Sequence, residues 1–126
     1  MESISSMANI CYVRQNHPKE LGHTIFKVKS FVVDETFVTA LGDDIVYNDI
    51  PVVKQLIDNY SKYSSCIVGY QEVKEADVSK YGIVKPSKSL DKKIVEMEKF
   101  IEKPSIEEAP LKLACLGRYL LTPKDI

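Results

Sequence analysis

The sequence has no long hydrophobic run and no excess of charge of either sign. No apolar stretch approaches the roughly 20 residues that a membrane-spanning helix needs. The 17 basic and 18 acidic side chains leave a formal net charge of −1, which gives no general affinity for nucleic acid or anionic membranes. The first ten residues lack the basic and then apolar segments of a secretory signal. At 126 residues, these absences predict a globular cytoplasmic chain of one domain or less.

Cysteine is also scarce. Cys11, Cys66 and Cys115 are widely spaced and form no Cys-x-x-Cys pair, which argues against a zinc site. Each lies in an apolar run, so we expect reduced thiols that behave as small buried hydrophobic groups. His17 and His23 have no neighbours that suggest a catalytic triad or a metal site, and we expect both to be structural or solvated.

Hydrophobic periodicity and turn residues predict a chain in which strands and helices alternate at first. This order favours an α/β fold with a sheet that is largely parallel in its first half and has right-handed crossovers. Thr122 followed by Pro123 predicts the start of a helix. The predicted strands are 9–15, 36–41, 65–73, 94–104 and 111–121, the helices are 22–32 and 51–63, a turn or short helix in 75–84 leads into a strand, and 85–93 is an exposed hairpin loop.

An acidic pair follows the predicted buried strand at 36–41. The strand ends at Gly42, Asp43 and Asp44 come next, and Asp49 lies a few residues on. Ligands of α/β sheets bind beyond the carboxyl ends of strands, and Mg²⁺ is often held by one or two carboxylates together with phosphates and water. The segment lacks the glycine and glutamate spacing of a calcium-binding hand. A plain turn and a magnesium site both remain open on this pattern.

Five short motifs together resemble the bacterial UTP–glucose-1-phosphate uridylyltransferases. They are YVRQ…LGHT, LGDDIVY, YGIV, IEKP…EEAP and GRYLLTP, in the order and spacing of that family from about Ile10 to the last residue. The resemblance implies one partial nucleotidyltransferase domain over residues 1–126, with a partial Rossmann-like fold, a mixed sheet and flanking helices. It also implies formation of UDP-glucose and pyrophosphate from UTP and glucose 1-phosphate with Mg²⁺.

The resemblance also implies roles for individual residues, with Asp43 and Lys103 as the catalytic pair. Adjacent residues of a strand point to opposite faces, so Glu102 and Lys103 could serve one ligand only if a bulge or bend redirects one of them. The implied contacts are Gln15 to the uracil edge, Asp43 to Mg²⁺ near the α-phosphate with Asp44 as a less direct neighbour, Gly82 to the sugar through its backbone, Glu102 to sugar hydroxyls, and Lys103 to the phosphates.

Three departures from the family weaken the functional prediction. No segment matches the glycine-rich G-x-G-T-R-x-x-P loop whose backbone amides cradle the triphosphate. Glu20 stands where the family usually has glycine, and Leu111 and Lys112 where it usually has Ser-Asn. We expect a chain that begins after the triphosphate loop, ends before the second acidic metal ligand, and is inactive alone. A non-catalytic sugar-nucleotide-binding or regulatory module is the alternative, and a related enzyme with another base or sugar is a third.

The missing loop portion has a consequence for association. Without the first strands of the family fold, a central strand would become an edge with unpaired backbone groups. We therefore expect a homo-oligomer or a rearranged edge.

Overall fold

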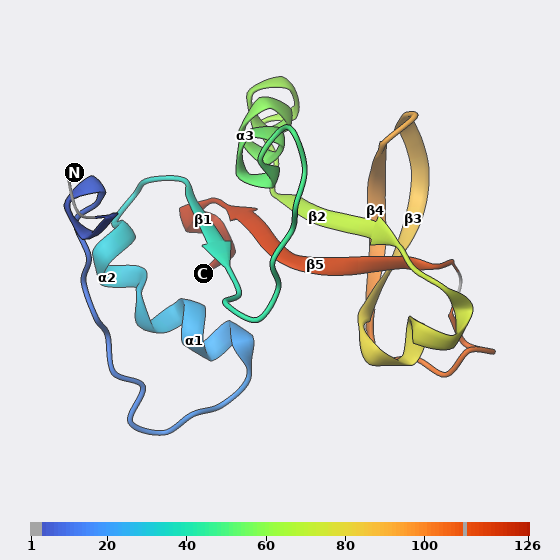
Figure 1. The fold of residues 1–126 in the computed structure, drawn as a ribbon, viewed down its shortest axis with the longest axis horizontal. Coiled ribbons are helices and arrows are strands. Elements are labelled where there is room, and N and C mark those ends of the chain that lie inside the picture. The colour runs from blue at the N-terminus through green and yellow to red at the C-terminus, as the bar shows by residue number, and fades with distance from the viewer. Residues whose placement is uncertain (1–3, 110) are drawn as a thin grey trace. The chain divides into compact units, whose positions relative to one another are not determined.

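The computed structural model of the chain describes residues 4–109 and 111–126. The chain divides into two compact units, each considered by itself here. One comprises Met1–Thr36 with Thr122–Ile126, and the other comprises Phe37–Leu121. Figure 1 labels the elements of both. None of the helices in the described ranges is long and apolar enough to cross a membrane.

The first unit is helical. The predicted helix at 22–32 is present in two pieces, and the predicted helix start at Thr122 is confirmed by a capping box with Asp125. The Lys29 ammonium donates to the Ile126 carbonyl at 2.8 Å, which joins the two segments of the unit. The predicted strand at 9–15 is wrong, because this segment pairs with no strand of residues 4–109 or 111–126 and is irregular. The elements are η1 (Ile4–Met7), α1 (Leu21–Lys27), α2 (Lys29–Val32) and η3 (Pro123–Asp125).

The second unit is a five-stranded sheet in the order β1-β5-β3-β4, with β2 paired to β5 as well (Figure 1). Every pairing among its strands is antiparallel, so the predicted parallel first half is wrong. Leu120 of β5 faces Val38 of β1 on one side and Ile67 of β2 on the other. The last strand therefore lies between two strands that precede it and run in the opposite direction. The strands are β1 (Phe37–Ala40), β2 (Ile67–Glu72), β3 (Gly82–Asp91), β4 (Ile94–Glu102) and β5 (Leu113–Leu121).

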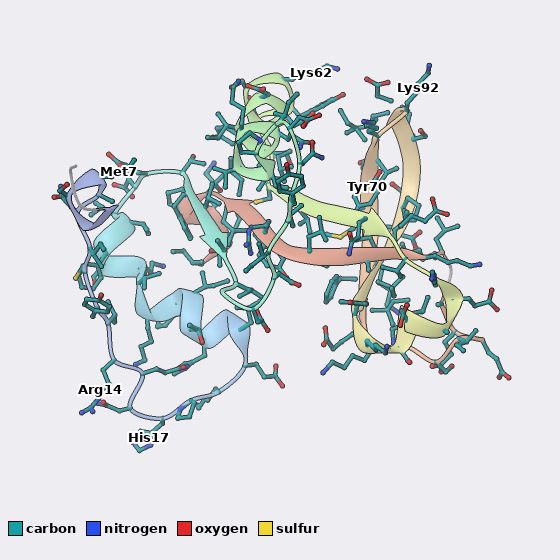
Figure 2. All side chains as sticks on the ribbon, viewed as in Figure 1. Met7, Arg14, His17, Lys62, Tyr70 and Lys92 are labelled. Atoms are coloured by element: carbon teal, nitrogen blue, oxygen red, sulfur yellow. The ribbon has the colours of Figure 1, made fainter. Side chains whose placement is uncertain are left out.

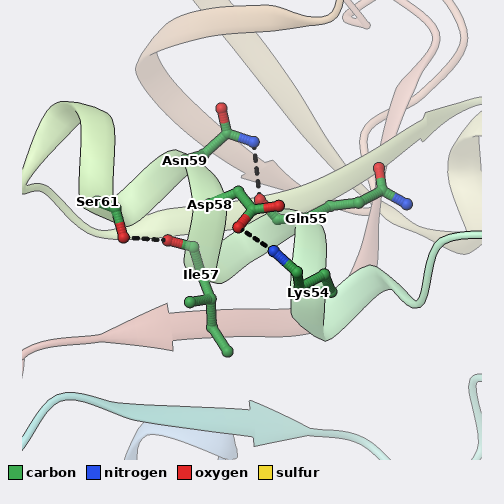
Figure 3. Close-up of polar contacts among 6 residues, drawn as sticks. All are labelled: Lys54, Gln55, Ile57, Asp58, Asn59 and Ser61. Carbon is green, nitrogen blue, oxygen red and sulfur yellow. Dashed lines mark hydrogen bonds and ion pairs between the residues drawn. The ribbon is translucent and has the colours of Figure 1, made fainter.

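The helix α3 (Val52–Tyr63) confirms the predicted helix at 51–63. Its buried Leu56 faces the sheet, and the helix contacts β2 and β5. Local polar contacts of the helix include the Lys54–Asp58 ion pair and a 3.0 Å bond from the Ser61 hydroxyl to the Ile57 carbonyl (Figure 3). The amphipathic spacing that predicted this helix is the spacing that packs it.

The hairpin of β3 and β4 replaces the predicted loop at 85–93. The strand β3 continues to Asp91, and only a tight turn that contains Lys92 separates it from β4 (Figure 2). An ion pair of 2.9 Å between Lys85 and Glu98 links the two strands. The predicted loop is wrong because polar composition does not exclude a strand: a solvated hairpin needs little apolar content to pair. The preceding η2 (Glu75–Lys80) agrees with the predicted short helix before the strand.

A small core lies where β3, β5 and η2 meet. Ile83 and Ala114 have no exposed surface and Val78 is 1% exposed. Cys115 is buried as predicted, and Cys66 is half-buried. Cys11 is exposed, so its predicted burial is wrong, because the segment around it forms no strand that could cover it.

Candidate active site

The acidic turn, residues 41–44, follows β1 and lies beside β5. The Leu41 amide donates to the Gly117 carbonyl at 2.9 Å, which extends the β1–β5 pairing by one step. The Arg118 guanidinium donates to the Leu41 carbonyl at 2.6 Å and also to the Asp44 carbonyl. The Asp43 side chain is exposed and that of Asp44 is half-buried. The turn is thus held on β5, with one carboxylate against the sheet and the other in solvent.

A bulge in β5 makes room for the acidic turn. Val68 of β2 faces Tyr119, yet Tyr70, two residues on, faces Cys115, so β5 carries extra residues at this point. Among them is Gly117, with a φ of +62°. A Cβ at Gly117 would lie 2.8 Å from the Asp44 carboxylate oxygen Oδ2. Glycine is required here by both the backbone conformation and the close approach of Asp44.

Gly117 and Arg118 both lie in the GRYLLTP motif, but neither has a role in the predictions from the sequence. The available signal was a glycine inside an apolar strand, which often marks a bulge or a close backbone approach.

The backbone bends at the end of β4, between the adjacent residues Glu102 and Lys103. Glu102 is the last residue of β4 and pairs with Gly82. Lys103 has a φ of +42°, and its amide donates to the Tyr81 carbonyl at 3.1 Å. The chain therefore turns at Lys103, and the strict alternation of side chains stops at Glu102. A non-glycine residue in this region costs on the order of 1 kcal/mol or more, and such strain is often found at functional sites.

Gly82 is needed for packing within the hairpin. A Cβ at this position would lie 2.0 Å from the Cζ atom of the Phe100 ring. The ring thus occupies the space that a side chain would take. A backbone approach to a sugar at Gly82 stays a prediction.

Tyr119 of β5 carries a half-buried phenol with a raised pKa. Burial raises the pKa of its phenol above the ordinary range, and the hydrogen bond with Cys115 raises that pKa further. This bond joins Sγ and Oη over 3.2 Å. The negative charges of Glu102 and Asp44 also raise the Tyr119 pKa.

This raised pKa predicts a loss of stability in alkali. Ionisation of Tyr119 costs more in the folded chain than in the unfolded chain, so its contribution is present below about pH 10 and is lost as the pH rises further. We expect urea unfolding to show a smaller loss between about pH 8 and about pH 11 for Tyr119→Phe than for the unaltered chain. Tyr47→Phe, at a side chain that is 98% exposed, is the control and should match the unaltered chain. Equal losses in all three proteins would contradict the assignment.

Gln15 belongs to the first unit and is half-buried there. Its Nε2 lies 2.6 Å from His23 Nδ1, and the Thr24 hydroxyl donates to its Oε1 at 3.2 Å. The two contacts orient the Gln15 amide from α1, which gives His23 the structural role expected of it. Exposed Glu20 lines a shallow depression of about 560 Å³ with Lys19, Gly22 and His23.

Lys112, one of the departures from the family, forms an ion pair of 2.9 Å with Glu75. Both side chains are largely exposed, so the pair adds little stability. A cavity of about 750 Å³ lies between α3, β2 and the hairpin. Neither Asp43 nor the Gly82, Glu102 and Lys103 group lines this cavity.

The donor set of the acidic turn fits a hard cation only in part. Within the described residues, no three His, Cys, Asp or Glu side chains gather into a group that could hold a metal ion. Asp43 and Asp44 offer two adjacent carboxylates. Mg²⁺ commonly takes one or two protein carboxylates and completes its shell with phosphates and water, so these residues suit a cation that binds together with a phosphorylated ligand.

Comparison with known proteins identifies the class. The nucleotidyl transferase family matches residues 2–125, and the chain belongs to this family. The match runs through both compact units. The sheet with flanking helices is the nucleotidyltransferase fold seen in solved relatives, as the resemblance implied.

The particular relatives are glucose-1-phosphate uridylyltransferases. The chain is 46% identical over 119 residues to UTP–glucose-1-phosphate uridylyltransferase 2 of Staphylococcus saprophyticus and 45% identical over 120 residues to the enzyme of Staphylococcus epidermidis. These matches cover 94% and 95% of the chain but 41% of each relative.

Solved structures give the same result. A UDP-glucose pyrophosphorylase complexed with UDP-glucose is 40% identical with a TM-score of 0.85, over 90% of this chain and 44% of that one. A UTP-bound UGPase from Acinetobacter baumannii is 30% identical with a TM-score of 0.80, over 89% of this chain and 40% of that one. The chain thus spans less than half the length of the relatives it matches.

Proposed function

We propose that this chain carries part of the site of a cytoplasmic UTP–glucose-1-phosphate uridylyltransferase, within one partial domain. The carrying observation is that the acidic turn follows β1 and is held on β5 by the Leu41–Gly117 and Arg118–Leu41 hydrogen bonds, which leave Asp43 exposed. The resemblance assigns the cation to this turn and the sugar to Glu102 at the end of β4. The relatives that are 40–46% identical support the choice of UDP-glucose as the ligand.

In this proposal the acidic turn holds Mg²⁺ through Asp43, with Asp44 beside it. Bound Mg²⁺ supplies positive charge where negative charge develops during nucleotidyl transfer. Lys103 contacts the phosphates and Glu102 accepts hydrogen bonds from sugar hydroxyls. Because the backbone turns at Lys103, the Lys103 side chain is not bound to the face opposite Glu102, as it would be in a regular strand. Gln15, oriented by His23 and Thr24, contacts the uracil edge, and Gly82 offers backbone to the sugar.

Calorimetric titration of UDP-glucose into the chain, with and without Mg²⁺, tests this proposal. We expect Mg²⁺-dependent binding that Asp43→Ala weakens at least tenfold. Asp49→Ala is the matched control, because Asp49 is an exposed acid in the segment that follows the acidic turn. Absence of heat at millimolar ligand from a folded sample, or equal effects of the two substitutions, would contradict the proposal.

The chain alone is proposed to bind without catalysing, because its sequence holds no glycine-rich triphosphate loop. Formation of UDP-glucose from UTP and glucose 1-phosphate by the purified chain would overturn this.

A self-associating, non-catalytic module is the second candidate. Within the second unit, the described part of β1 pairs only with β5, so no other strand of that unit covers the second edge of β1. A homo-oligomer that pairs through such an edge would appear as a multiple of the 14.3 kDa chain mass in sedimentation.

A further inference from the structure

Arg118 bridges the two ends of the acidic turn. Its Nη1 donates to the Leu41 carbonyl at 2.6 Å and to the Gly117 carbonyl at 3.1 Å, while its Nη2 donates to the Asp44 carbonyl. The two ends of the turn are thus joined by one planar group. The guanidinium offers donors in a rigid fork, so it can hold both carbonyls at once.

The contacts of Arg118 are made with backbone rather than with the acids. Among the ion pairs of the described residues, none joins Arg118 to Asp43 or Asp44. An arginine next to a carboxylate would ordinarily pair with it in a fork. Here the Nη1 and Nη2 donors hold backbone carbonyls, so Arg118 shapes the turn without forming an ion pair with Asp43 or Asp44.

We propose that Arg118 is a positioning residue that holds the acidic turn so that the Asp43 carboxylate projects, without an ion pair, toward a divalent cation. This inference rests on the proposed function of the acidic turn. It adds a residue from β5 to the residues that the proposed function names. Arg118 lies opposite Ala40 at the end of β1, next to the bulge residue Gly117.

The test measures Mn²⁺ binding to the full chain by electron paramagnetic resonance of the free ion, and amide hydrogen exchange of residues 41–46. We expect Arg118→Ala to weaken Mn²⁺ binding at least tenfold and to speed exchange in 41–46. Arg118→Lys should lose a similar part of the binding, because one ammonium on a flexible stem cannot hold both carbonyls. Arg14→Ala, at the chain's other arginine, which is exposed, should leave both readouts unchanged.

The outcomes separate the positioning role of Arg118 from the proposed cation site of the acidic turn. If Asp43→Asn loses Mn²⁺ while Arg118→Ala binds it as the unaltered chain does, the positioning role is overturned and the proposed site stands. If Arg118→Ala does not fold, a folded Arg118→Lys with normal binding and exchange overturns the role in the same way. If the unaltered chain binds no Mn²⁺, the cation site fails, and the positioning role fails with it.

Discussion

Replacing Ile83 by alanine is expected to lower the free energy of unfolding by about 2–5 kcal/mol, the usual cost of deleting most of a buried isoleucine. Ile83 has no exposed surface and lies on β3 opposite Ala114 of β5 and Ile101 of β4. It packs in the cluster with Val78. Since a whole domain is stable by only about 5–15 kcal/mol, this loss would remove a large share of the total.

Urea unfolding followed by circular dichroism measures this effect, because the chain has no tryptophan to report by fluorescence. Ile45→Ala is the matched control. Its side chain is 91% exposed, so the same chemical change should shift stability by no more than about 0.5 kcal/mol. Similar unfolding midpoints for the two variants would show that the cluster around Ile83 does not stabilise the fold.

Gly117→Ala is expected to destabilise the chain by about 1–3 kcal/mol, because alanine would have to adopt the left-handed backbone conformation. The φ of +62° is one cause. Crowding is the second, since the new methyl group would lie 2.8 Å from Asp44 Oδ2 and 3.0 Å from Leu41 Cβ. The acidic turn would have to move away from β5 to relieve this contact.

Gly42→Ala is the control for this effect. No atom lies within 4 Å of a Cβ built at Gly42, and its φ is outside the left-handed region. Urea unfolding should therefore separate the two substitutions clearly, with Gly42→Ala close to the unaltered chain. Equal stabilities would mean that the bulge tolerates a side chain and that Gly117 does not set the position of the turn.

Local patterns predicted the helix α3 and the capped turn at Thr122 correctly. In both, the predicting pattern lies within a short stretch of sequence: the spacing of apolar residues in α3 and the capping residues of η3. The predicted strand at 9–15 is wrong because a strand needs a partner to pair with, and the described residues provide none for this segment. The predicted loop at 85–93 is wrong for the opposite reason: β4 pairs with this segment, although its polar composition does not indicate a strand.

The sheet topology depended on the end of the chain. The alternation of predicted strands and helices suggested parallel neighbours, but β5 lies between β1 and β2 and pairs antiparallel with each. No periodicity encodes which strand a later segment will join, because the choice depends on all faces being buried together.

The sequence by itself determined the family, through motifs spread along the whole chain, and it located the acidic pair at a strand end. The tertiary structure alone decided how that pair is held. The contact between Arg118 and Leu41 joins residues 77 positions apart. The bulge at Gly117 and the turn at Lys103 likewise depend on neighbours from other strands. Such geometry follows from packing between distant segments, and packing is a property of the folded chain rather than of any local stretch.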